Sequence, residues 1–232
     1  MSSSTEYNLS GKTILITGAS SGIGRSTALE LARTSPSLKL ILTALGDDVA
    51  VLVKQLDVSR KADIDAFWQE LEKEEGFKDV GVLVNNARFI SGVERPPDVP
   101  REVIESVYKT NVMGVIHMTQ AALAVFRKRL EGGKGDIVML GSIARRQAYV
   151  GGTIYCSSKA AIQAFGESLR KEVVDTRIRI MTVDPGQAPI EFNDIRHRGD
   201  REKADAVYAI NVFAVGRREN VVVMDTLLYP SH

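Results

Sequence analysis

Short apolar runs alternate with longer amphipathic segments along most of this 232-residue chain. The apolar runs predict β-strands at residues 12–17, 38–44, 49–56, 80–85, 136–142, 178–183 and 220–224. The segments between them have helical spacing and predict helices at residues 24–34, 60–75, 102–130 and 153–174. Strands that alternate with helices are typical of a parallel sheet covered on both faces. We therefore predict an α/β protein with one domain over residues 1–232 and a doubly wound, mostly parallel seven-stranded sheet.

The connection between the second and third predicted strands is too short for a crossover helix. Only residues 45–48 separate them, whereas adjacent parallel strands need a crossover of about a dozen residues or more. Either these strands are not parallel neighbours, or about twenty residues of the usual crossover are absent near Ala44–Asp48. We favour the second explanation.

Composition and charge limit the class of protein. Hydrophobic residues make up 44% of the chain, enough for a sizeable core, and the formal net charge of +1 gives no long-range attraction to nucleic acid or an anionic membrane. No stretch approaches the length of a membrane span, about 18 apolar residues, and the polar N-terminus lacks the apolar core of a signal peptide. Cys156 is the only cysteine, so no intrachain disulfide forms. We expect a cytoplasmic protein that binds neither nucleic acid nor membrane.

A glycine-rich turn, TGASSGIG, follows the first predicted strand and opens the first predicted helix. Glycines permit unusual dihedral angles and let backbone N–H groups approach a pyrophosphate, which the positive end of a helix also favours. Such a cluster also occurs in loops that bind nothing, but its place between a strand and a helix favours a dinucleotide site of the Rossmann type. The candidate cofactor-binding residues in this turn are Gly18, Ser20, Ser21, Gly22, Ile23 and Gly24.

Tyr155 and Lys159 are four residues apart on a predicted helix and therefore share one face. A tyrosine with a pKa of about 10 is a poor acid or base at neutral pH, but a nearby ammonium group lowers that pKa. Ser142 ends the fifth predicted strand, where α/β sheets bind ligands, and Asn111 lies within an otherwise apolar helical stretch. Singly, each residue also fits an ordinary role, as a chance pair, a helix cap, a core hydrogen bond or a kink. Their joint occurrence after the glycine turn favours catalysis.

With its Gly-x-x-x-Gly-x-Gly spacing and these four residues, the chain resembles the short-chain dehydrogenase/reductase family over essentially its whole length. The resemblance implies hydride transfer between a nicotinamide cofactor and a small alcohol or carbonyl compound. It implies that Tyr155 is the general acid/base and that Lys159 lowers its pKa and holds the nicotinamide ribose. It also implies that Ser142 orients the substrate oxygen and that Asn111 holds a water of the proton relay.

Further family marks imply cofactor contacts at Asp57, Val58, Asn85, Ala87, Pro185 and Gly186. Asp57 also fits a helix cap, and Pro185-Gly186 also fits a plain turn. Two positions depart from the family pattern. Arg88 replaces the glycine after Asn-Asn-Ala and either crowds the cofactor or points to solvent. Ile190 replaces a threonine that contacts the nicotinamide amide, a contact that isoleucine cannot make.

Four stretches resemble one subgroup, the fungal NADP-dependent 3-hydroxy acid dehydrogenases: KTILITGASSGIGRSTALELA, SLRKEVVDTRIRI, GDREKADAVYA and RRENVVVMDTLLYPSH. The resemblance implies oxidation at C3 of a short 3-hydroxy acid such as L-serine or L-allo-threonine, or reduction of the 3-oxo compound in reverse. It implies NADP rather than NAD, and no metal. Ala44 occupies the position where NAD users carry an acidic residue, so nothing there repels a 2′-phosphate; Arg25 either assists or is solvated. A second segment is absent near Ile210–Asn211 relative to the subgroup.

The sequence says less about the substrate and the oligomeric state. Residues 191–200 are expected to cover the substrate, and Arg146 and Gln147 either meet a substrate carboxylate or form plain surface. A homotetramer is expected from the family's helical interface, where small side chains permit close approach, although they also suit ordinary helix-on-sheet packing. These side chains are Ala121, Ala122, Ala124, Ala160, Ala161 and Ala164. Two alternatives stay open: a broad-range carbonyl reductase, and a dinucleotide-binding protein without catalysis, which the departures from the family pattern motivate.

Overall fold

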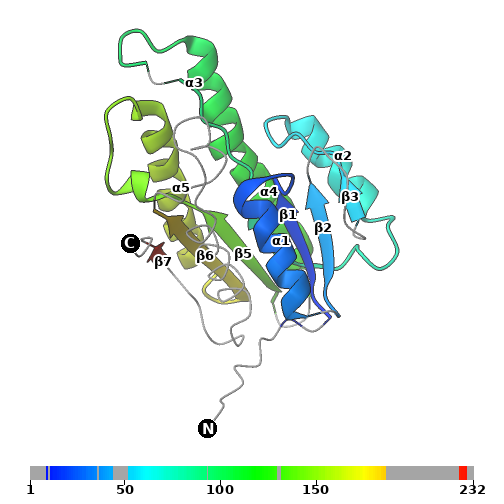
Figure 1. The fold of residues 1–232 in the computed structure, drawn as a ribbon. Coiled ribbons are helices and arrows are strands. Elements are labelled where there is room, and N and C mark those ends of the chain that lie inside the picture. The colour runs from blue at the N-terminus through cyan, green and yellow to red at the C-terminus, as the bar shows by residue number, and fades with distance from the viewer. Residues whose placement is uncertain are drawn as a thin grey trace.

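The computed structural model describes residues 9, 11–35, 37–43, 52–92, 94–129, 132–186 and 225–228. Seven strands form one sheet in the order β3-β2-β1-β4-β5-β6-β7, and every neighbouring pair is parallel (Figure 1). The strands are β1 (Thr13–Thr17), β2 (Lys39–Thr43), β3 (Leu52–Lys54), β4 (Val80–Asn85), β5 (Lys134–Leu140), β6 (Arg177–Pro185) and β7 (Asp225–Leu228). The helices are α1 (Gly22–Thr34), α2 (Lys61–Leu71), α3 (Arg101–Tyr108), α4 (Val115–Phe126) and α5 (Thr153–Glu172), with shorter turns at η1 (Lys109–Gly114) and η2 (Ile143–Arg145). The predicted seven-stranded Rossmann-type sheet is confirmed.

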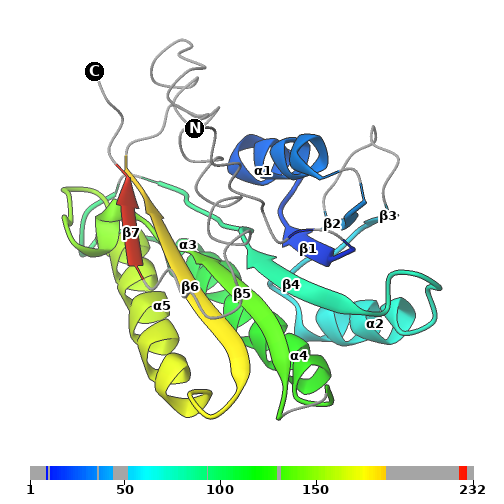
Figure 2. The same cartoon turned by 90° about the horizontal axis from the view of Figure 1, so that it is seen from below.

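Helices cover both faces of the sheet. Figure 2 shows α1 on one face and α2, α4 and α5 on the other. Alternate residues of β1 pack on the two faces of the sheet, because successive side chains of a strand point to opposite sides. Ile14 and Ile16 pack in the cluster that includes Leu31 of α1, whereas Leu15 packs in the cluster that includes Ile64 of α2. Within the described residues, every helix is too short or too polar to cross a membrane.

The helix predicted at residues 102–130 is interrupted. A π-helix, η1, separates α3 from α4, and Asn111 lies within it. Single π-turns inserted into α-helices are frequent at functional sites. Gly114 ends η1 where a β-carbon would lie 2.7 Å from the carbonyl oxygen of Val58, so only glycine allows this close approach. Hydrophobic spacing alone does not reveal such an interruption.

Two strand predictions need correction. Strands β2 and β3 are parallel neighbours, with Ile41 opposite Leu52, so the explanation that they are not neighbours is wrong. The connection, residues 44–51, lies outside the described residues, and the absence of a crossover there stays a prediction. The strand predicted at residues 220–224 also lies outside them and stays a prediction, and the last described strand is β7, at Asp225–Leu228. The second predicted absence, near residues 210–211, lies outside them as well.

Candidate active site

The carboxyl ends of the strands carry almost all of the predicted site. The strand order reverses between β1 and β4, and in open α/β sheets the crevice at such a reversal binds the ligand. The glycine turn leaves β1 at this edge, Asn85–Ala87 ends β4, and Ser142 follows β5 by two residues. The fold therefore brings together segments that lie far apart in the sequence.

The glycine turn has a backbone that other residues resist. Gly18 and Gly22 have φ angles of 63° and 53°, in the left-handed region that favours glycine. A β-carbon on Gly18 would lie 2.8 Å from the Cα of Ala87, and one on Gly24 would lie 2.4 Å from the Nδ2 of Asn86. The turn is therefore packed directly against the end of β4, with no room for a side chain on its inner side.

Two polar residues that were not among the candidate cofactor-binding residues hold this packing. Thr17 Oγ1 accepts hydrogen bonds from the backbone N–H groups of Asn86 and Ala87, both at 3.0 Å. Asn86 Nδ2 donates to the carbonyl oxygens of Thr17 and Gly18 at 2.7 and 2.8 Å. Their position within the glycine and Asn-Asn-Ala motifs was the available signal, since buried polar groups at strand ends need partners.

The turn fits a dinucleotide pyrophosphate. Helix α1 begins at Gly22, so its first N–H groups and its positive end face the loop, while Ser20 and Ser21 are exposed and Ile23 is buried. Asn86 Oδ1 is buried and has no hydrogen-bond partner among the described residues, which leaves an acceptor for a donor of a bound ligand. The close-packed glycines and this unpaired acceptor together suit a nicotinamide dinucleotide.

We expect the Gly24→Ala substitution to weaken dinucleotide binding by about tenfold to a hundredfold, since overpacking costs about 1–3 kcal/mol. The added methyl group would displace Asn86 or the carbonyl of Gly18, which shape the turn. The dissociation constant for NADPH or NADH, measured from nucleotide fluorescence, reports the effect. Gly81→Ala is the matched control, because its methyl group would meet only the Thr13 carbonyl, at 3.7 Å. Equal affinities in both variants would contradict this assignment of the turn.

Asn111 acts here as a clamp on the segment after β4. Its Oδ1 accepts the backbone N–H of Phe89 at 2.7 Å, and its Nδ2 donates to the carbonyl of the same residue at 2.8 Å. A third hydrogen bond, 3.2 Å long, runs from Nδ2 to Ser158 Oγ on α5. The side chain of this buried residue is thus occupied by the protein, while the predicted role with a relay water stays a prediction.

Tyr155 and Lys159 share one face of α5, as their spacing predicts. The Lys159 Nζ lies 5.8 Å from the centroid of the Tyr155 ring and donates a 2.7 Å hydrogen bond to the carbonyl of Leu140, the last residue of β5. Lys159 is buried, at 3% exposure, and Tyr155 is half-buried. Ser142 lies two residues after Leu140. Tyr155 and Lys159, called the dyad below, therefore meet Ser142 at one edge of the sheet.

The electrostatics of the dyad differ from the expectation. Burial raises the pKa of Tyr155 above its usual value of 10, opposed by the positive charge of Arg88 and by hydrogen bonding with the Ser142 side chain. Burial likewise lowers the pKa of Lys159 to about 7, with Arg88 acting in the same direction and Asp184 against it. Lys159 is therefore not among the groups that lower the pKa of Tyr155 in the free protein; Arg88 lowers it, but burial outweighs this effect.

Arg88 contributes to the electrostatics of the site. It follows β4 between two anchored residues, Ala87 and Phe89, and its side chain is half-buried. Its charge lowers the pKa of both Tyr155 and Lys159, while the choice between crowding the cofactor and pointing to solvent stays a prediction. It has no hydrogen-bond or ion-pair partner among the residues that the structure describes.

Ser142 caps the short helix η2 and belongs to a buried network. Its Oγ accepts the N–H of Ala144 at 3.2 Å, so the ordinary role of a helix cap is real and coexists with the contact to Tyr155. Its backbone N–H donates to Asp184 Oδ1 at 3.0 Å. Arg145 donates from Nε to Asp184 Oδ2 at 2.6 Å. Neither Arg145 nor Asp184 was predicted, because 39 residues separate them and only the fold joins them.

The remaining predicted cofactor-binding residues lie in positions that are compatible with cofactor contacts. These contacts stay predictions. Asn85 Nδ2 donates to Thr119 Oγ1 at 3.0 Å, and Asp57 Oδ1 accepts the N–H of Ser59 at 2.9 Å in the turn before α2. Val58 is buried, Pro185 ends β6 and Gly186 follows it.

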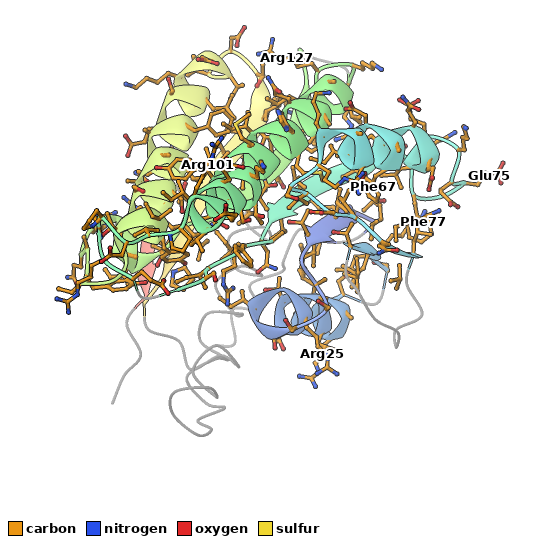
Figure 3. The ribbon with its side chains drawn as sticks, turned by 90° about the horizontal axis from the view of Figure 1, so that it is seen from above. Arg25, Phe67, Glu75, Phe77, Arg101 and Arg127 are labelled. Atoms are coloured by element: carbon orange, nitrogen blue, oxygen red, sulfur yellow. The ribbon has the colours of Figure 1, made fainter. Side chains whose placement is uncertain are left out.

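The last candidates divide into three groups. Arg25 is exposed and points away from the sheet in the first turn of α1 (Figure 3). Arg146 is exposed, with its Nε 3.8 Å from Asp184 Oδ2, so part of its charge faces the buried network. Ala44, Ile190 and residues 191–200 lie outside the described residues.

Known proteins match the chain along nearly its whole length. The family model described as "short chain dehydrogenase" matches residues 12–194. An NADP-dependent 3-hydroxy acid dehydrogenase of Schizosaccharomyces pombe is 45% identical, over 97% of this chain and 94% of that protein. A serine 3-dehydrogenase of Rhizobium radiobacter is 30% identical, over 84% of this chain and 80% of that protein. The resemblance to a fungal subgroup of hydroxy acid dehydrogenases is thus confirmed.

Solved structures agree with these matches. A closed form of serine dehydrogenase complexed with NADP+ has a TM-score of 0.81 at 26% identity, over 93% of this chain and 94% of that one. The alignment with the Schizosaccharomyces pombe protein extends over 250 positions, more than the 232 residues of this chain. That relative therefore has residues that this chain lacks, although their location stays a prediction. The chain belongs to the short-chain dehydrogenase family, as the glycine turn and the Tyr155–Lys159 pair predicted.

Proposed function

We propose that this protein is an NADP-dependent oxidoreductase that oxidises a short 3-hydroxy acid, such as L-serine or L-allo-threonine, at C3, and reduces the 3-oxo compound in reverse. The observation that carries the proposal is the meeting of Tyr155, Lys159 and Ser142 at the carboxyl edge of the sheet, from which the glycine turn also leaves. The names of the relatives, NADP-dependent 3-hydroxy acid dehydrogenase and serine 3-dehydrogenase, support the cofactor and the substrate class.

The residues of this chain divide the work between position and proton transfer. A bound nicotinamide dinucleotide supplies the carbon that accepts or gives the hydride. The Tyr155 hydroxyl exchanges the proton of the substrate oxygen, and the Ser142 hydroxyl, beside it, orients that oxygen. Lys159, fixed by the carbonyl of Leu140, places its amine beside Tyr155, where it would hold a ribose hydroxyl of the cofactor.

The pKa directions set the dependence on pH. Burial holds the pKa of Tyr155 above 10, so the phenol carries its proton at neutral pH and is ready to donate it in the direction of reduction. Oxidation needs the phenolate, so its rate is expected to rise as pH increases above neutrality. The positive charge of Arg88 lowers the pKa of Tyr155 and thereby brings this rise to lower pH.

The acidic substrate is supported by Arg88. A half-buried guanidinium without a described partner, beside the group that takes the substrate proton, is an unsatisfied site for an anion. In a 3-hydroxy acid the carboxylate is two bonds from the reacting carbon, so it would lie within a few ångströms of the Tyr155 hydroxyl, which takes the proton. A 3-hydroxy acid therefore matches the charge of the site, whereas a neutral ketone leaves the cation unpaired.

We expect Arg88→Met to raise KM for a 3-hydroxy acid by about tenfold to a hundredfold, because a hydrogen bond to a charged group contributes about 1.5–3 kcal/mol. KM for the matching neutral methyl ester should change by less than about threefold. Initial rates of NADP+ reduction with both compounds measure the two values. Without the positive charge the pKa of Tyr155 rises, so the rise of the oxidation rate is also expected to move to higher pH.

Arg101→Met is the matched control, since Arg101 is exposed on α3 and pairs only with Glu105 among the described residues (Figure 3). Arg88→Lys, which keeps the charge, is expected to retain part of the preference for the acid. Equal changes for acid and ester would show that Arg88 does not bind the carboxylate. A changed dissociation constant for NADPH alone would instead assign Arg88 to the cofactor.

A broad-range carbonyl reductase is the alternative within the family. Turnover of L-serine compared with that of a neutral 3-oxo ester separates the two, and the proposal requires that the acid is used. We also propose that the protein is cytoplasmic, since a single cysteine suits a reducing compartment. We propose a homotetramer because the small side chains of Ala124, Ala160 and Ala164 are exposed on α4 and α5. Sedimentation velocity measures the mass of the assembly, and a monomer would contradict the tetramer.

A further inference from the structure

Asp184 is a fully buried carboxylate that the mechanism above does not use. It is the next-to-last residue of β6, just before Pro185, and its side chain is 0% exposed. A buried charge is strongly unfavourable unless it is paired and hydrogen-bonded. Asp184 meets this need through the backbone N–H of Ser142 on one oxygen and the guanidinium of Arg145 on the other.

The ion pair with Arg145 has the geometry of a strong interaction. Both Nε and Nη2 of Arg145 contact Asp184 Oδ2, with Nε at 2.6 Å, and the Arg145 side chain is only 7% exposed. Arg146 adds a second cation, with its Nε 3.8 Å away. Charge-assisted contacts of this kind are short and directional. The carboxylate is therefore held in one place rather than free to turn.

Gly141 makes the reach of the carboxylate possible. Its N–H donates to the carbonyl of Val183 at 2.8 Å and continues the β5–β6 ladder by one residue. A β-carbon at this position would lie 1.9 Å from Asp184 Oδ1, so any side chain here would push the carboxylate off the N–H of Ser142. The glycine and the aspartate thus fit together as one unit across the two strands.

The turn from Leu140 to Ser142, held in this way, makes contacts with both members of the catalytic dyad, Lys159 and Tyr155. Leu140 accepts the hydrogen bond of Lys159 Nζ, and Ser142 hydrogen-bonds with Tyr155. Asp184 fixes the backbone between these two points. Its negative charge also acts on Lys159 against Arg88, and it raises the pKa of that lysine. The groups that face Lys159 are Arg88 after β4, the Leu140 carbonyl on β5, Asp184 on β6 and Tyr155 on its own helix.

We propose that Asp184, clamped by Arg145, is a positioning residue that fixes the turn from Leu140 to Ser142 against Tyr155 and Lys159. The proposal rests on the proposed function only for the choice of assay. Asp184 touches no reacting atom and acts through Ser142 and Lys159. Misplacement of a catalytic group by about 1 Å lowers turnover by about a hundredfold, so loss of the clamp acts mainly on kcat.

The test compares two buried aspartate–arginine ion pairs, one between β6 and η2 and one between β5 and β6. Asp184→Asn keeps an acceptor for the Ser142 N–H but loses the charge that holds Arg145. Asp136→Asn is the matched control: Asp136 on β5 accepts two 2.7 Å hydrogen bonds from Arg179, opposite it on β6, and lies toward the other end of the sheet. Both substitutions break a buried aspartate–arginine pair in which two guanidinium nitrogens contact the carboxylate, and Asp136 also pairs with Lys12. Only the first pair touches the site.

We expect Asp184→Asn to lower kcat by about tenfold to a hundredfold with NADPH affinity changed less than threefold, roughly the scatter of such constants. Asp136→Asn should lower the melting temperature without changing kcat. Arg145→Met is expected to reproduce the loss in kcat, and Asp184→Glu, which keeps the charge, to recover part of it. Assays with a neutral 3-oxo ester and NADPH keep this test separate from the choice of an acidic substrate.

A readout independent of turnover is the titration of Lys159. In protein labelled with ¹³C at the lysine Cε, with Lys159→Met used for assignment, the midpoint should fall below the wild-type value of about 7 in Asp184→Asn and stay unchanged in Asp136→Asn. A shift in the first variant alone supports the proposal. Equal effects of both variants on melting temperature, with the Lys159 titration and kcat unchanged, would overturn it and leave Asp184 with a structural role only.

Discussion

The Tyr155→Phe variant is expected to turn over its substrate about 100- to 10,000-fold more slowly than the wild type, which is the usual contribution of a positioned acid or base. The phenylalanine keeps the ring that packs beneath Lys159 Nζ but has no hydroxyl to exchange the proton. Initial rates of NADPH oxidation at saturating carbonyl substrate measure kcat. The dissociation constant for NADPH should stay within about threefold of the wild type, because the ring is retained.

Tyr108→Phe is the control for the loss of a phenol. Its hydroxyl donates to Ser157 Oγ on the exposed side of α5, outside the dyad, so its removal should leave kcat unchanged. A wild type that oxidises NADPH, together with a Tyr155→Phe variant of equal kcat, would contradict the assignment of the acid. An equal loss in both variants would show instead a general effect on α5.

The Lys159→Met variant is expected to lose at least about a hundredfold in kcat/KM, because a side chain positioned at the site of proton transfer contributes on this scale. Methionine fills a similar volume but makes no hydrogen bond to the Leu140 carbonyl and brings no charge to the dyad. Steady-state rates with saturating NADPH report the loss. Lys171→Met, an exposed position on the same helix, is the matched control.

Lys159 also makes stability depend on pH in a predictable direction. Its pKa is about 7 in the folded protein and 10.5 in the unfolded chain, so between these values the unfolded state binds more protons. The free energy of unfolding is therefore expected to rise as pH increases from about 7 toward 10. Denaturant unfolding at a series of pH values should show a smaller rise in Lys159→Met than in Lys171→Met. Equal slopes in the two variants would contradict the buried, readily deprotonated amine.

Much of the fold was predictable because its strands are apolar on both faces. The strand at residues 80–85 agrees with β4 at both ends, and five of its six residues are buried. Of the described residues of the strand predicted at 49–56, only Leu52–Lys54 form β3, since β3 lies at the edge of the described sheet, where one neighbour and partial exposure give less packing. The π-helix around Asn111 was not predictable, because it depends on the approach of Gly114 to Val58 from a distant segment.

The site likewise has residues that the sequence predicts and residues that it does not. Gly18, Tyr155 and Lys159 were identified because their chemistry is local and their spacing fixes their geometry. The direction in which the pKa of Tyr155 shifts was not predicted, because burial by the surrounding fold outweighs the neighbouring charges. The pair of Asp184 and Arg145 was also missed, because neither residue has a distinctive sequence neighbourhood and only the β5–β6 pairing brings them together.

Direct hydride transfer is the event on which the whole account depends. Wild-type protein would be incubated with NADP+ and L-serine or 3-hydroxybutyrate deuterated at C3, and the nucleotide product analysed by mass spectrometry. The account predicts NADPH that carries one deuterium from the substrate, at a rate that falls in parallel with kcat in Tyr155→Phe. A folded protein that binds NADPH but forms no deuterated nucleotide from any 3-hydroxy acid would contradict it.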